Sequence, residues 1–437
     1  MKVSDFLKLI KYLPASLIFL FIFQFQTVSA QEEFAYGADI GWLSEMEYHD
    51  YIFINSAGVQ MNCLAILKEK GINALRFRVW VNPKDGYCNK RDVTYMAHRA
   101  DSMGFKVMLD FHLSDTWADP GHQTKPAAWV NHTITELSAD VYNHVYDILD
   151  TLKSIGIIPK WVQIGNETND GTLWETCRAT KSMSNFASII KSGYDAVKAV
   201  DSSIQVIVHL SDGHNNQMFR WMFDGLKNNG AKWDIIGMSV YPFWANLPWA
   251  VDDSLALINM NDMIARYQTK VMVVEAGHPY NQAATAKSYL LDLIAKTKSV
   301  GGLGVFYWEP ECYSWRGYQM GAWDPVSKKP TIAMDAFLES STTSVDREEI
   351  ITNYNLNIYP NPFNSNTTIE YTLPEASNIS IVIYDILGRE VYRLVDGFKA
   401  SGNYNATWSA AYIPSGVYFC RMKSEDFLKT KKIMLLK

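Results

Sequence analysis

The chain lacks an excess of basic residues and, after its first 30 residues, any long apolar run. Lys and Arg number 40 against 46 Asp and Glu, which gives a net charge of -6. A surface that binds nucleic acid or an anionic membrane needs a basic patch, so we expect no nucleic-acid partner and no membrane surface. The chain also lacks a glycine-rich phosphate turn after its first apolar strand, where GADIGWLSE stands instead. This absence disfavours an open dinucleotide-binding sheet.

Cysteine is scarce and odd in number. With 5 cysteines, an exported protein keeps at least one thiol unpaired, and spacing alone does not say which one. The spacings do not match those of zinc ligands. A domain of this size does not need disulfides to fold, so the pairing stays open at this point. The residues are Cys63, Cys88, Cys177, Cys312 and Cys420.

The one long apolar run lies at the N-terminus and has the pattern of an export signal. Three lysines precede LPASLIFLFIF, and the small-residue sequence VSA precedes Gln31. A charged segment, an apolar segment and a cleavage site in this order form a secretory signal peptide. The run is too short for a permanent transmembrane helix. Residues 1–30 are therefore predicted to be a signal peptide that is removed after Ala30.

Apolar β-rich runs alternate with segments of helical period from about residue 35 to residue 340. The helical segments, such as 141–156 and 286–302, end at glycine, a common helix stop. Eight such strands predict an α/β fold, a closed (β/α)8 TIM barrel over residues 31–340, with an open doubly wound sheet as the alternative. The predicted strands are 36–42, 72–81, 105–113, 160–167, 204–210, 233–241, 270–277 and 302–310.

The last 83 residues have a different character. A polar segment, 341–354, precedes them and is predicted to be a linker. Short β-branched runs then alternate with the turn signals NPFN, ILGR, SGNY and IPSG, which predicts a small all-β, immunoglobulin-like sandwich domain over residues 355–437. It has no cluster of His, Asp or Glu, so no chemistry is expected there. The predicted strands are 367–373, 379–385, 389–395, 416–422 and 429–436.

Polar and aromatic residues collect at the carboxyl ends of the barrel strands, where barrel enzymes place their chemistry. Solvated loops would carry scattered Lys, Ser and Glu, so the bias toward Trp, His and carboxylates indicates a functional mouth. The 14 Trp and 24 Tyr pack in cores or, since pyranose faces are apolar, stack against sugars. The strand-end residues are Asp39, Trp42, Arg78, Trp80, Asp110, His112, Asn166, Glu167, His209, Tyr241, Glu275, Trp308 and Glu309.

Two of these residues form a candidate catalytic pair, which meets only if the barrel closes. Glu167 closes the fourth predicted strand and Glu275 the seventh. Glycoside hydrolysis uses one carboxylic acid to protonate the leaving oxygen and a second carboxylate, which is the nucleophile at a retaining spacing of about 5–5.5 Å. Mutual repulsion and burial keep one carboxyl protonated, and Asn166 would point its amide at the sugar 2-hydroxyl. For either Glu alone, the alternative is a carboxylate at a helix start.

The neighbours of this pair have structural alternatives. By alternation, Arg76 and Arg78 share one face of their strand. A buried arginine needs a carboxylate partner, so Arg78 is predicted to bond Glu275, and Arg76, which lies deeper, to be structural. His112 and His209 either orient the carboxyl groups or the substrate, or are hydrogen-bonded barrel histidines.

The same stretches resemble a known family. RFRVWVNP, DFHLSDTWADPGHQ, QIGNE, VYPFW, VVEAG and FYWEP closely resemble glycoside hydrolase family 53, the arabinogalactan endo-β-1,4-galactanases, over about residues 35–340. DFHLSDTWADPGHQ is long and specific, whereas QIGNE fits several retaining glycosidase families. The resemblance implies a retaining cut inside β-1,4-galactan, the side chain of pectic arabinogalactan, with Glu167 as acid/base and Glu275 as nucleophile.

The resemblance also implies a substrate groove. Trp117, Asp119 and Pro120 fall in the loop that lines the groove in this family, and Trp308 and Glu309 would lie under the bound sugar. Further substrate contacts are expected from the strand-end residues Asp39, Arg78, Asp110, His112, Asn166, His209 and Tyr241.

No metal and no cofactor is expected. Bacterial members that resemble this chain often carry a long loop after the seventh strand with an Asp/His/Asn calcium site. Here the run after Glu275 is AGHPYNQAATAKSYLL, which is short and lacks that acidic cluster, so calcium is only an alternative. No zinc spacing is found among Asp110, His112 and Asp115.

The C-terminal domain resembles the type A sorting domain of the type IX secretion system in IYPNPFNSNTTIEYTL, IYDILGREV and PSGVYFCRM. The resemblance implies an export address read by the secretion machinery, so the protein would pass through the periplasm and be secreted or held at the cell surface. The alternative is a carbohydrate-binding module, which usually shows a row of exposed aromatics. Here only Trp408 and scattered Tyr are available.

Together these features predict an exported, retaining endo-β-1,4-galactanase that acts as a monomer on a polysaccharide. One alternative is another retaining barrel glycanase, acting on mannan or glucan. The other is a non-catalytic galactan-binding protein, which the presence of both acids disfavours.

Overall fold

The computed structural model describes residues 32–345, 355–373, 377–399, 402–424 and 427–437. The chain divides into two compact units, Met1–Phe337 and Leu338–Lys437. We call them the barrel unit and the C-terminal unit. The predicted signal peptide, residues 1–30, lies outside the described residues.

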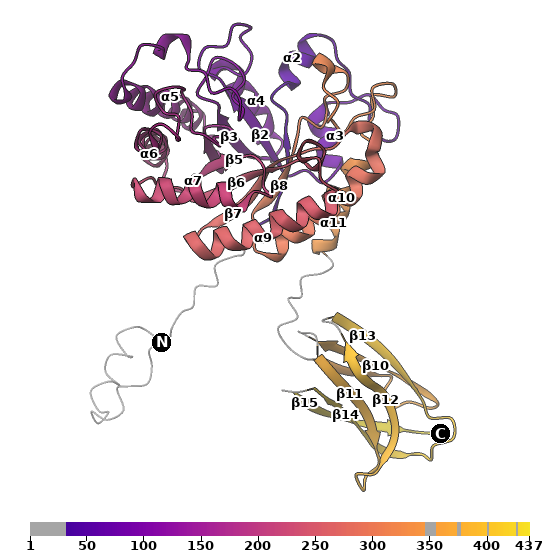
Figure 1. Ribbon diagram of the computed structural model, residues 1–437. Coiled ribbons are helices and arrows are strands. Elements are labelled where there is room, and N and C mark those ends of the chain that lie inside the picture. The colour runs from indigo at the N-terminus through magenta and orange to yellow at the C-terminus, as the bar shows by residue number, and fades with distance from the viewer. Residues whose placement is uncertain (1–31, 346–354, 374–376, 400–401, 425–426) are drawn as a thin grey trace, which may run out of the picture. The chain divides into compact units, whose positions relative to one another are not determined.

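The barrel unit contains a closed parallel barrel whose strands follow chain order, with β8 paired to β1 (Figure 1). This arrangement confirms the predicted (β/α)8 TIM fold. Parallel strands need a crossover between them, and helices supply most of these crossovers on the outside of the barrel. The strands are β1 (Ala35–Asp39), β2 (Ala74–Val79), β3 (Lys106–Phe111), β4 (Trp161–Ile164), β5 (Gln205–Leu210), β6 (Ile235–Val240), β7 (Lys270–Ala276) and β8 (Gly304–Trp308).

The helices start where the sequence supplies capping residues. At the start of α5, the Thr133 hydroxyl accepts the N–H of Glu136 while the Glu136 carboxylate accepts the N–H of Thr133, a capping box. Asn and Ser caps begin α4 and α6 in the same way. The helices are α2 (Leu43–Tyr48), α3 (Cys63–Glu69), α4 (Lys90–Ser102), α5 (Ile134–Ser154), α6 (Met183–Val200), α7 (Asn216–Asn228), α8 (Pro242–Ala245), α9 (Trp249–Tyr267), α10 (Ala283–Ser299) and α11 (Asp335–Val345).

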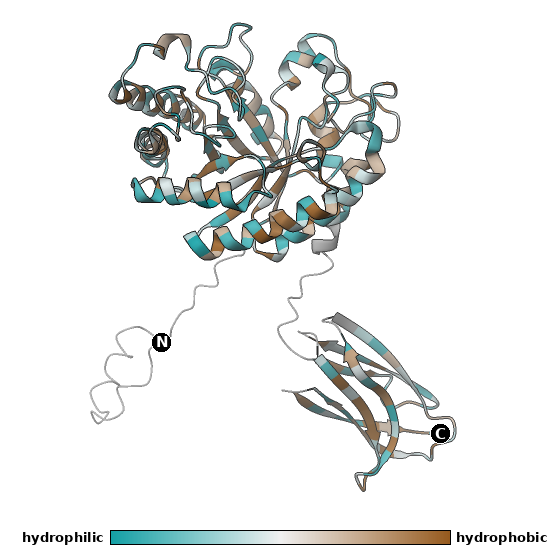
Figure 2. Cartoon of the chain, in the orientation of Figure 1, coloured by the Kyte–Doolittle hydropathy of each residue, from teal (hydrophilic) through white to brown (hydrophobic). Residues whose placement is uncertain are grey.

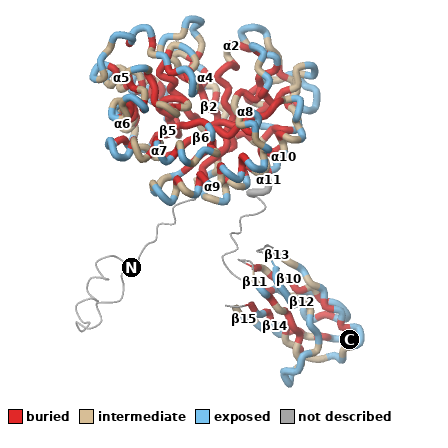
Figure 3. Tube along the Cα trace, viewed as in Figure 1, coloured by how far each residue is buried: buried red, intermediate tan, exposed pale blue. Residues whose placement is uncertain are grey.

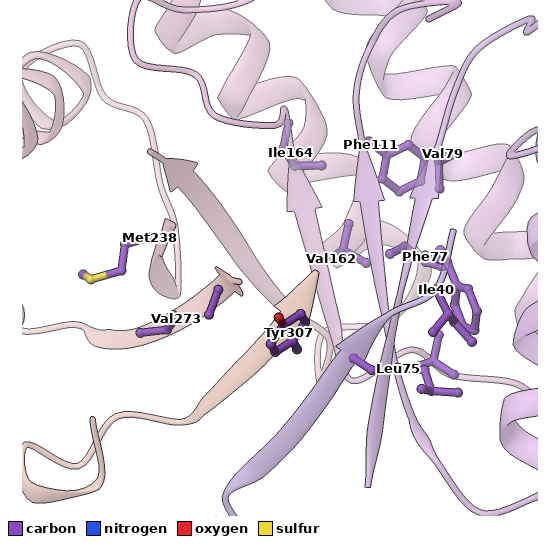
Figure 4. Close-up of a cluster of buried hydrophobic side chains, with 14 of the residues drawn as sticks. Ile40, Leu75, Phe77, Val79, Phe111, Val162, Ile164, Met238, Val273 and Tyr307 are labelled. Carbon is purple, nitrogen blue, oxygen red and sulfur yellow. The ribbon is translucent and has the colours of Figure 1, made fainter. Parts of the chain in front are cut away.

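Alternation along the strands separates an outer apolar layer from the barrel interior. On β2, Leu75, Phe77 and Val79 belong to the large core between strands and helices (Figure 4), whereas Arg76 and Arg78 face inward. The strands are buried and apolar while the outer faces of the helices are exposed and polar (Figures 2 and 3). Each strand therefore contributes one face to fold stability and leaves the other for the interior.

The deep end of the barrel interior is a separate apolar core. The rings of Trp161 and Phe306 meet edge to face with centroids 6.1 Å apart. Gly37 leaves room for Phe306, since a Cβ at this glycine would lie 2.1 Å from the ring. This apolar floor confines the polar side chains to the other end of the barrel. Its members are Ala35, Ala74, Met108, Trp161, Ile207, Ile235, Met272, Val274, Leu303 and Phe306.

Strand β7 breaks the alternation at one point. Met272 and Val274 both belong to the interior core, so regular alternation would turn Glu275 outward. The pairing of β6 with β7 shifts register between Met238 and Ser239, so that Ser239 pairs with Glu275. This β-bulge turns the carboxylate of Glu275 into the barrel directly after Val274.

The C-terminal unit consists of two antiparallel sheets, which confirms its all-β prediction. One sheet has the order β13-β10-β9 and the other β12-β11-β14-β15. Trp408 and Cys420 lie in the core between apolar strand faces. The strands are β9 (Asn355–Tyr359), β10 (Asn366–Leu373), β11 (Ser377–Tyr384), β12 (Glu390–Lys399), β13 (Gly402–Ser409), β14 (Gly416–Lys423) and β15 (Leu428–Leu435).

The predicted linker differs from the structure at its start. Helix α11 continues to Val345, into the segment 341–354. Adding residues to a helix already begun at Asp335 costs less than nucleating a new one, so the weak helix formers STTS can extend it. Residues 346–354 lie outside the described residues.

Candidate active site

The two predicted acids lie together at the mouth of the barrel. Glu167 follows β4 after Gly165, with positive φ angles of 44° and 81° at the two residues, so the chain turns sharply as it leaves the strand. Ser239 on β6 connects the acids. Its hydroxyl donates to Glu167 Oε1 at 2.6 Å, and its register partner on β7 is Glu275. Through Ser239, both acids belong to the same end of the barrel interior, and the charge of Glu275 acts on Glu167.

Arg76 links the second acid to the rest of the polar interior. The guanidinium is fully buried. Its Nη1 donates to Asp39 Oδ2 at 2.6 Å and to Glu275 Oε1 at 2.8 Å. Its Nη2 donates to Asp110 Oδ2 at 2.8 Å and to Asn166 Oδ1 at 3.0 Å. One cation thus holds three carboxylates and the side-chain oxygens of two amides, Asn166 and Gln163, in a fixed arrangement.

The prediction that Arg78 bonds Glu275 is wrong, because Arg76 makes that bond. Arg78 Nη1 instead donates to Glu309 Oε1 at 3.1 Å. Arg76 and Arg78 have different partners because they lie at different depths along the barrel axis. Arg76 pairs in register with Asp39 on β1, at the level of the in-strand Glu275. Arg78 lies two residues nearer the mouth, where Glu309 follows the end of β8.

The surroundings shift the pKa values of the two acids by different amounts. Burial raises the pKa of Glu167 well above its usual value, and the charge of Glu275 raises it further. Burial also raises the pKa of Glu275, but Arg76 opposes this rise. Tyr241 donates its hydroxyl to Glu275 Oε2 at 3.2 Å, so both oxygens of Glu275 have donors. The pKa of Glu275 is raised only to about 7, so of the two acids Glu275 ionises more readily and Glu167 keeps its proton.

Two neutral histidines flank the acids. His112 Nε2 lies 2.9 Å from Asp110 Oδ2, and its Nδ1 accepts the N–H of Ala118 at 3.2 Å. His209 Nε2 lies 2.8 Å from Ser239 Oγ. Burial lowers the pKa of both rings, which keeps them uncharged near neutrality. Both are hydrogen-bonded inside the barrel, and His209 reaches Glu167 through one serine.

Asn166 fixes the neighbouring loop to the site. One N–H of its side-chain amide donates to the backbone carbonyl of Ala118 at 2.8 Å, and the backbone carbonyl of Asn166 accepts from Gln123 Nε2 at 2.8 Å. With Arg76 bound at Oδ1, the amide keeps one N–H for a ligand.

Aromatic rings form a wall beside the acids. Trp117 meets Trp42 and Trp308 edge to face, with centroids 5.5 and 5.8 Å apart. Tyr318 packs against Trp308 at 4.8 Å. The Arg78 guanidinium lies 4.1 Å from the centre of the Trp117 ring, a distance for a cation–π contact. This wall offers flat apolar surface next to charged groups.

Three residues that were predicted to contact the substrate lie among protein groups or in solvent instead. Glu309 is fully buried and accepts the N–H of Trp42 at 3.1 Å. Asp119 accepts the N–H of Gly121 at 2.7 Å within its own turn, and Pro120 is exposed beside it. The carboxylates of Glu309 and Asp119 are thus occupied by protein groups, and no hydrogen bond of the described residues brings Asp119 to the acids.

Sequence reasoning missed two polar residues of the site, Ser239 and Gln163. Gln163 Nε2 donates to Asp110 Oδ1 at 2.6 Å and lies 3.0 Å from His209 Nδ1. The available signal was the strand period of two. Ser239 lies two residues before Tyr241 in the predicted strand 233–241, so the period places both on one face.

The described ranges contain no group of three or more His, Cys, Asp or Glu that could hold a metal ion. The five cysteines are all described, and each is a buried free thiol. Over the same ranges, none of the helices combines the length and the apolarity needed to cross a membrane.

Comparison with known proteins agrees with this geometry. Residues 35–346 match glycosyl hydrolase family 53, and residues 357–436 match a secretion system C-terminal sorting domain. A probable arabinogalactan endo-beta-1,4-galactanase A of Aspergillus terreus is 34% identical over 63% of this chain and 84% of its own length. The arabinogalactan endo-beta-1,4-galactanase of Cellvibrio japonicus is 33% identical over 70% of this chain and 88% of its own.

Solved structures give the same result. The family 53 catalytic domain of Ignisphaera aggregans is 28% identical, with a TM-score of 0.63 over 70% of this chain and 95% of its own. A fungal beta-1,4-galactanase is 30% identical, with a TM-score of 0.64 over 70% of this chain and 99% of its own. The chain therefore belongs to glycosyl hydrolase family 53 and carries a C-terminal secretion sorting domain.

Proposed function

We propose that this glycoside hydrolase is an exported endo-β-1,4-galactanase that cuts the β-1,4-galactan side chains of pectic arabinogalactan with retention of configuration. The observation that carries the proposal is the unequal treatment of two neighbouring acids. Glu275 receives hydrogen bonds from the Arg76 cation and from Tyr241, whereas Glu167 receives one from the neutral Ser239.

In the first step, a Glu275 oxygen attacks the anomeric carbon and the glycosidic C–O bond breaks. Glu167 gives its proton to the leaving oxygen, so the released sugar leaves as a neutral alcohol. In the second step, the Glu167 carboxylate takes a proton from water while the water oxygen attacks the same carbon. The ester bond to Glu275 then breaks, and both acids return to their starting states.

The roles follow from the charges around each acid. A nucleophile must be ionised, and Arg76 lowers the pKa of Glu275 against the effect of burial. A general acid must hold its proton, and burial together with the Glu275 charge raises the pKa of Glu167. Once Glu275 is esterified its charge is gone, so the pKa of Glu167 falls and the carboxylate can act as base.

Galactan is proposed as the substrate because galactanases are among the family relatives most similar to this chain. Substrate contacts are proposed for Trp117 and Trp308, whose rings pack against each other in the aromatic wall, and for the free N–H of Asn166. Glu309 and Arg78 would act from beneath, by holding the aromatic wall.

The test uses the mature protein on linear β-1,4-galactan, mannan and β-glucan. We expect reducing ends from galactan alone, with the β-anomer appearing first in proton NMR spectra. Glu275→Gln and Glu167→Gln should fold normally and lower turnover on galactan by several orders of magnitude. Near-normal turnover by Glu275→Gln would overturn the mechanism. Hydrolysis of mannan or glucan would favour another barrel glycanase, and tight binding of uncut galactan a binding protein.

The sorting domain is proposed to direct the protein through a type IX secretion system to the cell surface or beyond. The match of residues 357–436 to a secretion sorting domain supports this route.

A further inference from the structure

A buried serine contacts the proposed acid/base. Ser239 lies near the end of β6 with 1% of its surface exposed. Its Oγ is 2.6 Å from Glu167 Oε1 and 2.8 Å from His209 Nε2. Among the hydrogen bonds of the described residues, this is the one that reaches the carboxyl group of Glu167.

The surrounding hydrogen bonds fix the direction of each proton. His209 Nδ1 faces two N–H donors, the backbone of Glu167 at 3.3 Å and Gln163 Nε2 at 3.0 Å. Its contact with Asn166 Oδ1, at 3.1 Å, is to an oxygen that already accepts from Arg76, so we assign Nδ1 as an acceptor without a proton. Burial and the charge of Arg76 lower the pKa of His209 and keep the ring neutral. The ring proton is therefore on Nε2 and is donated to Ser239 Oγ. Because that oxygen already accepts from His209, the single hydroxyl proton of Ser239 is donated to Glu167.

We propose that Ser239 is the positioning residue for proton transfer by Glu167: it engages Oε1 and thereby leaves Oε2 as the oxygen that carries the proton to the glycosidic oxygen. This inference rests on the proposed function of Glu167 as acid/base. An oxygen that accepts the serine proton cannot at the same time present its own proton in that direction, so the transferable proton belongs on the other oxygen. Ser239 thus selects both the rotation of the carboxyl group and the oxygen that reacts.

The same hydrogen bond serves both steps of the reaction. After the proton leaves, Glu167 is a carboxylate, and a hydrogen bond to an ionised group is stronger than one to a neutral group. Ser239 therefore lowers the pKa of Glu167 against burial and the charge of Glu275. Loss of the hydroxyl should leave Glu167 protonated to higher pH and less well oriented.

The experiment compares Ser239→Ala with the wild-type chain on two substrates that differ in their need for acid catalysis. One is β-1,4-galactotetraose, whose sugar leaving group must be protonated. The other is 2,4-dinitrophenyl β-galactobioside, whose leaving group needs no proton. We expect kcat/KM of Ser239→Ala to fall about 10- to 100-fold on the tetraose and less than about 3-fold on the aryl substrate. The alkaline limb of the pH profile on the tetraose should move to higher pH.

Ser114→Ala is the matched control. Ser114 is another buried serine at the mouth of the barrel, but its hydroxyl only accepts the N–H of Thr116, at 3.4 Å. Its loss should leave the ratio of the two rates as in the wild type. Equal losses on both substrates in Ser239→Ala, or no loss on the tetraose, would overturn the proposal while the proposed function could stand.

A measurement without substrate separates the two ideas. In protein labelled with ¹³C at the glutamate carboxyl carbons, the Glu167 signal is identified by its absence in Glu167→Gln. Its titration should shift to higher pH in Ser239→Ala and stay unchanged in Ser114→Ala. An unshifted titration refutes the role of Ser239 whatever the substrate. A wild-type chain that cleaves no galactan refutes the proposed function alone.

Discussion

Replacing Arg76 by Gln should move the acid limb of catalysis to higher pH. The change removes the one cation that contacts Glu275 while it keeps an amide donor of similar reach. A unit charge about 4 Å away at an effective dielectric constant of about 20 is worth about 4 kcal/mol, or about 3 pKa units. If relaxation of the site leaves only one third of this effect, the pKa of Glu275 still rises by about one unit. The nucleophile then ionises only at higher pH, which gives the direction of the shift.

The assay is the pH dependence of kcat/KM on galactan, whose acid limb reports ionisation of the nucleophile in the free enzyme. Arg78→Gln is the matched control, because Arg78 is an equally buried arginine that pairs with Glu309 instead. Both variants break a buried ion pair and should lose about 3–5 kcal/mol of unfolding free energy. Only Arg76→Gln should shift the limb. An unmoved limb, or an equal shift in Arg78→Gln, would refute the assignment of Arg76 to Glu275.

Three further outcomes follow from the structure. Burial and the neighbouring Asp292 raise the pKa of Asp253 to about 9. Between about pH 4 and 9 this carboxyl group is ionised in the unfolded chain but protonated in the folded one, which opposes folding. Asp253→Asn should therefore add about 1–3 kcal/mol of unfolding free energy at pH 7.5 and less toward pH 4 in urea melts, and an equal gain at both pH values would contradict this. Gly37→Ala should lower stability by about 1–3 kcal/mol, because its Cβ would lie 2.1 Å from the Phe306 ring, and an unchanged melting temperature would speak against this packing. Deletion of residues 357–436 should abolish export from a host with type IX machinery and leave galactan cleavage intact, so lost cleavage would show that the two units are not independent.

Much of the barrel and of its mouth could be predicted because strands have a period of two. The sequence ALRFRV already separates the outward Leu75 and Phe77 from the inward Arg76 and Arg78. The same rule, applied to every strand, gathers polar side chains at one end of the interior. It identifies which residues face inward and their order along one strand, but not which residues of different strands lie at the same depth, and the wrong partner for Arg78 resulted from that gap.

The inward turn of Glu275 could not be predicted in the same way. The run KVMVVEA gives no local sign of a bulge, which arises from the pairing of β7 with β6. Contacts between distant strands also decide the C-terminal unit. Strands β9 and β13 contain several Asn, a residue depleted in strands, and both were missed because their pairing with β10 compensates for that low propensity.

The bulge in β7 lets two successive residues, Val274 and Glu275, face the barrel interior. The first adds to the interior core, and the second is the proposed nucleophile. Deleting Val274 would restore an even pleat and cost the interior core one side chain. The glutamate would then follow Val273 directly, so regular alternation would still turn it into the barrel opposite Ser239. Natural or designed relatives with one residue fewer before this glutamate should therefore keep an inward carboxylate and lose some of the stability that the interior core supplies.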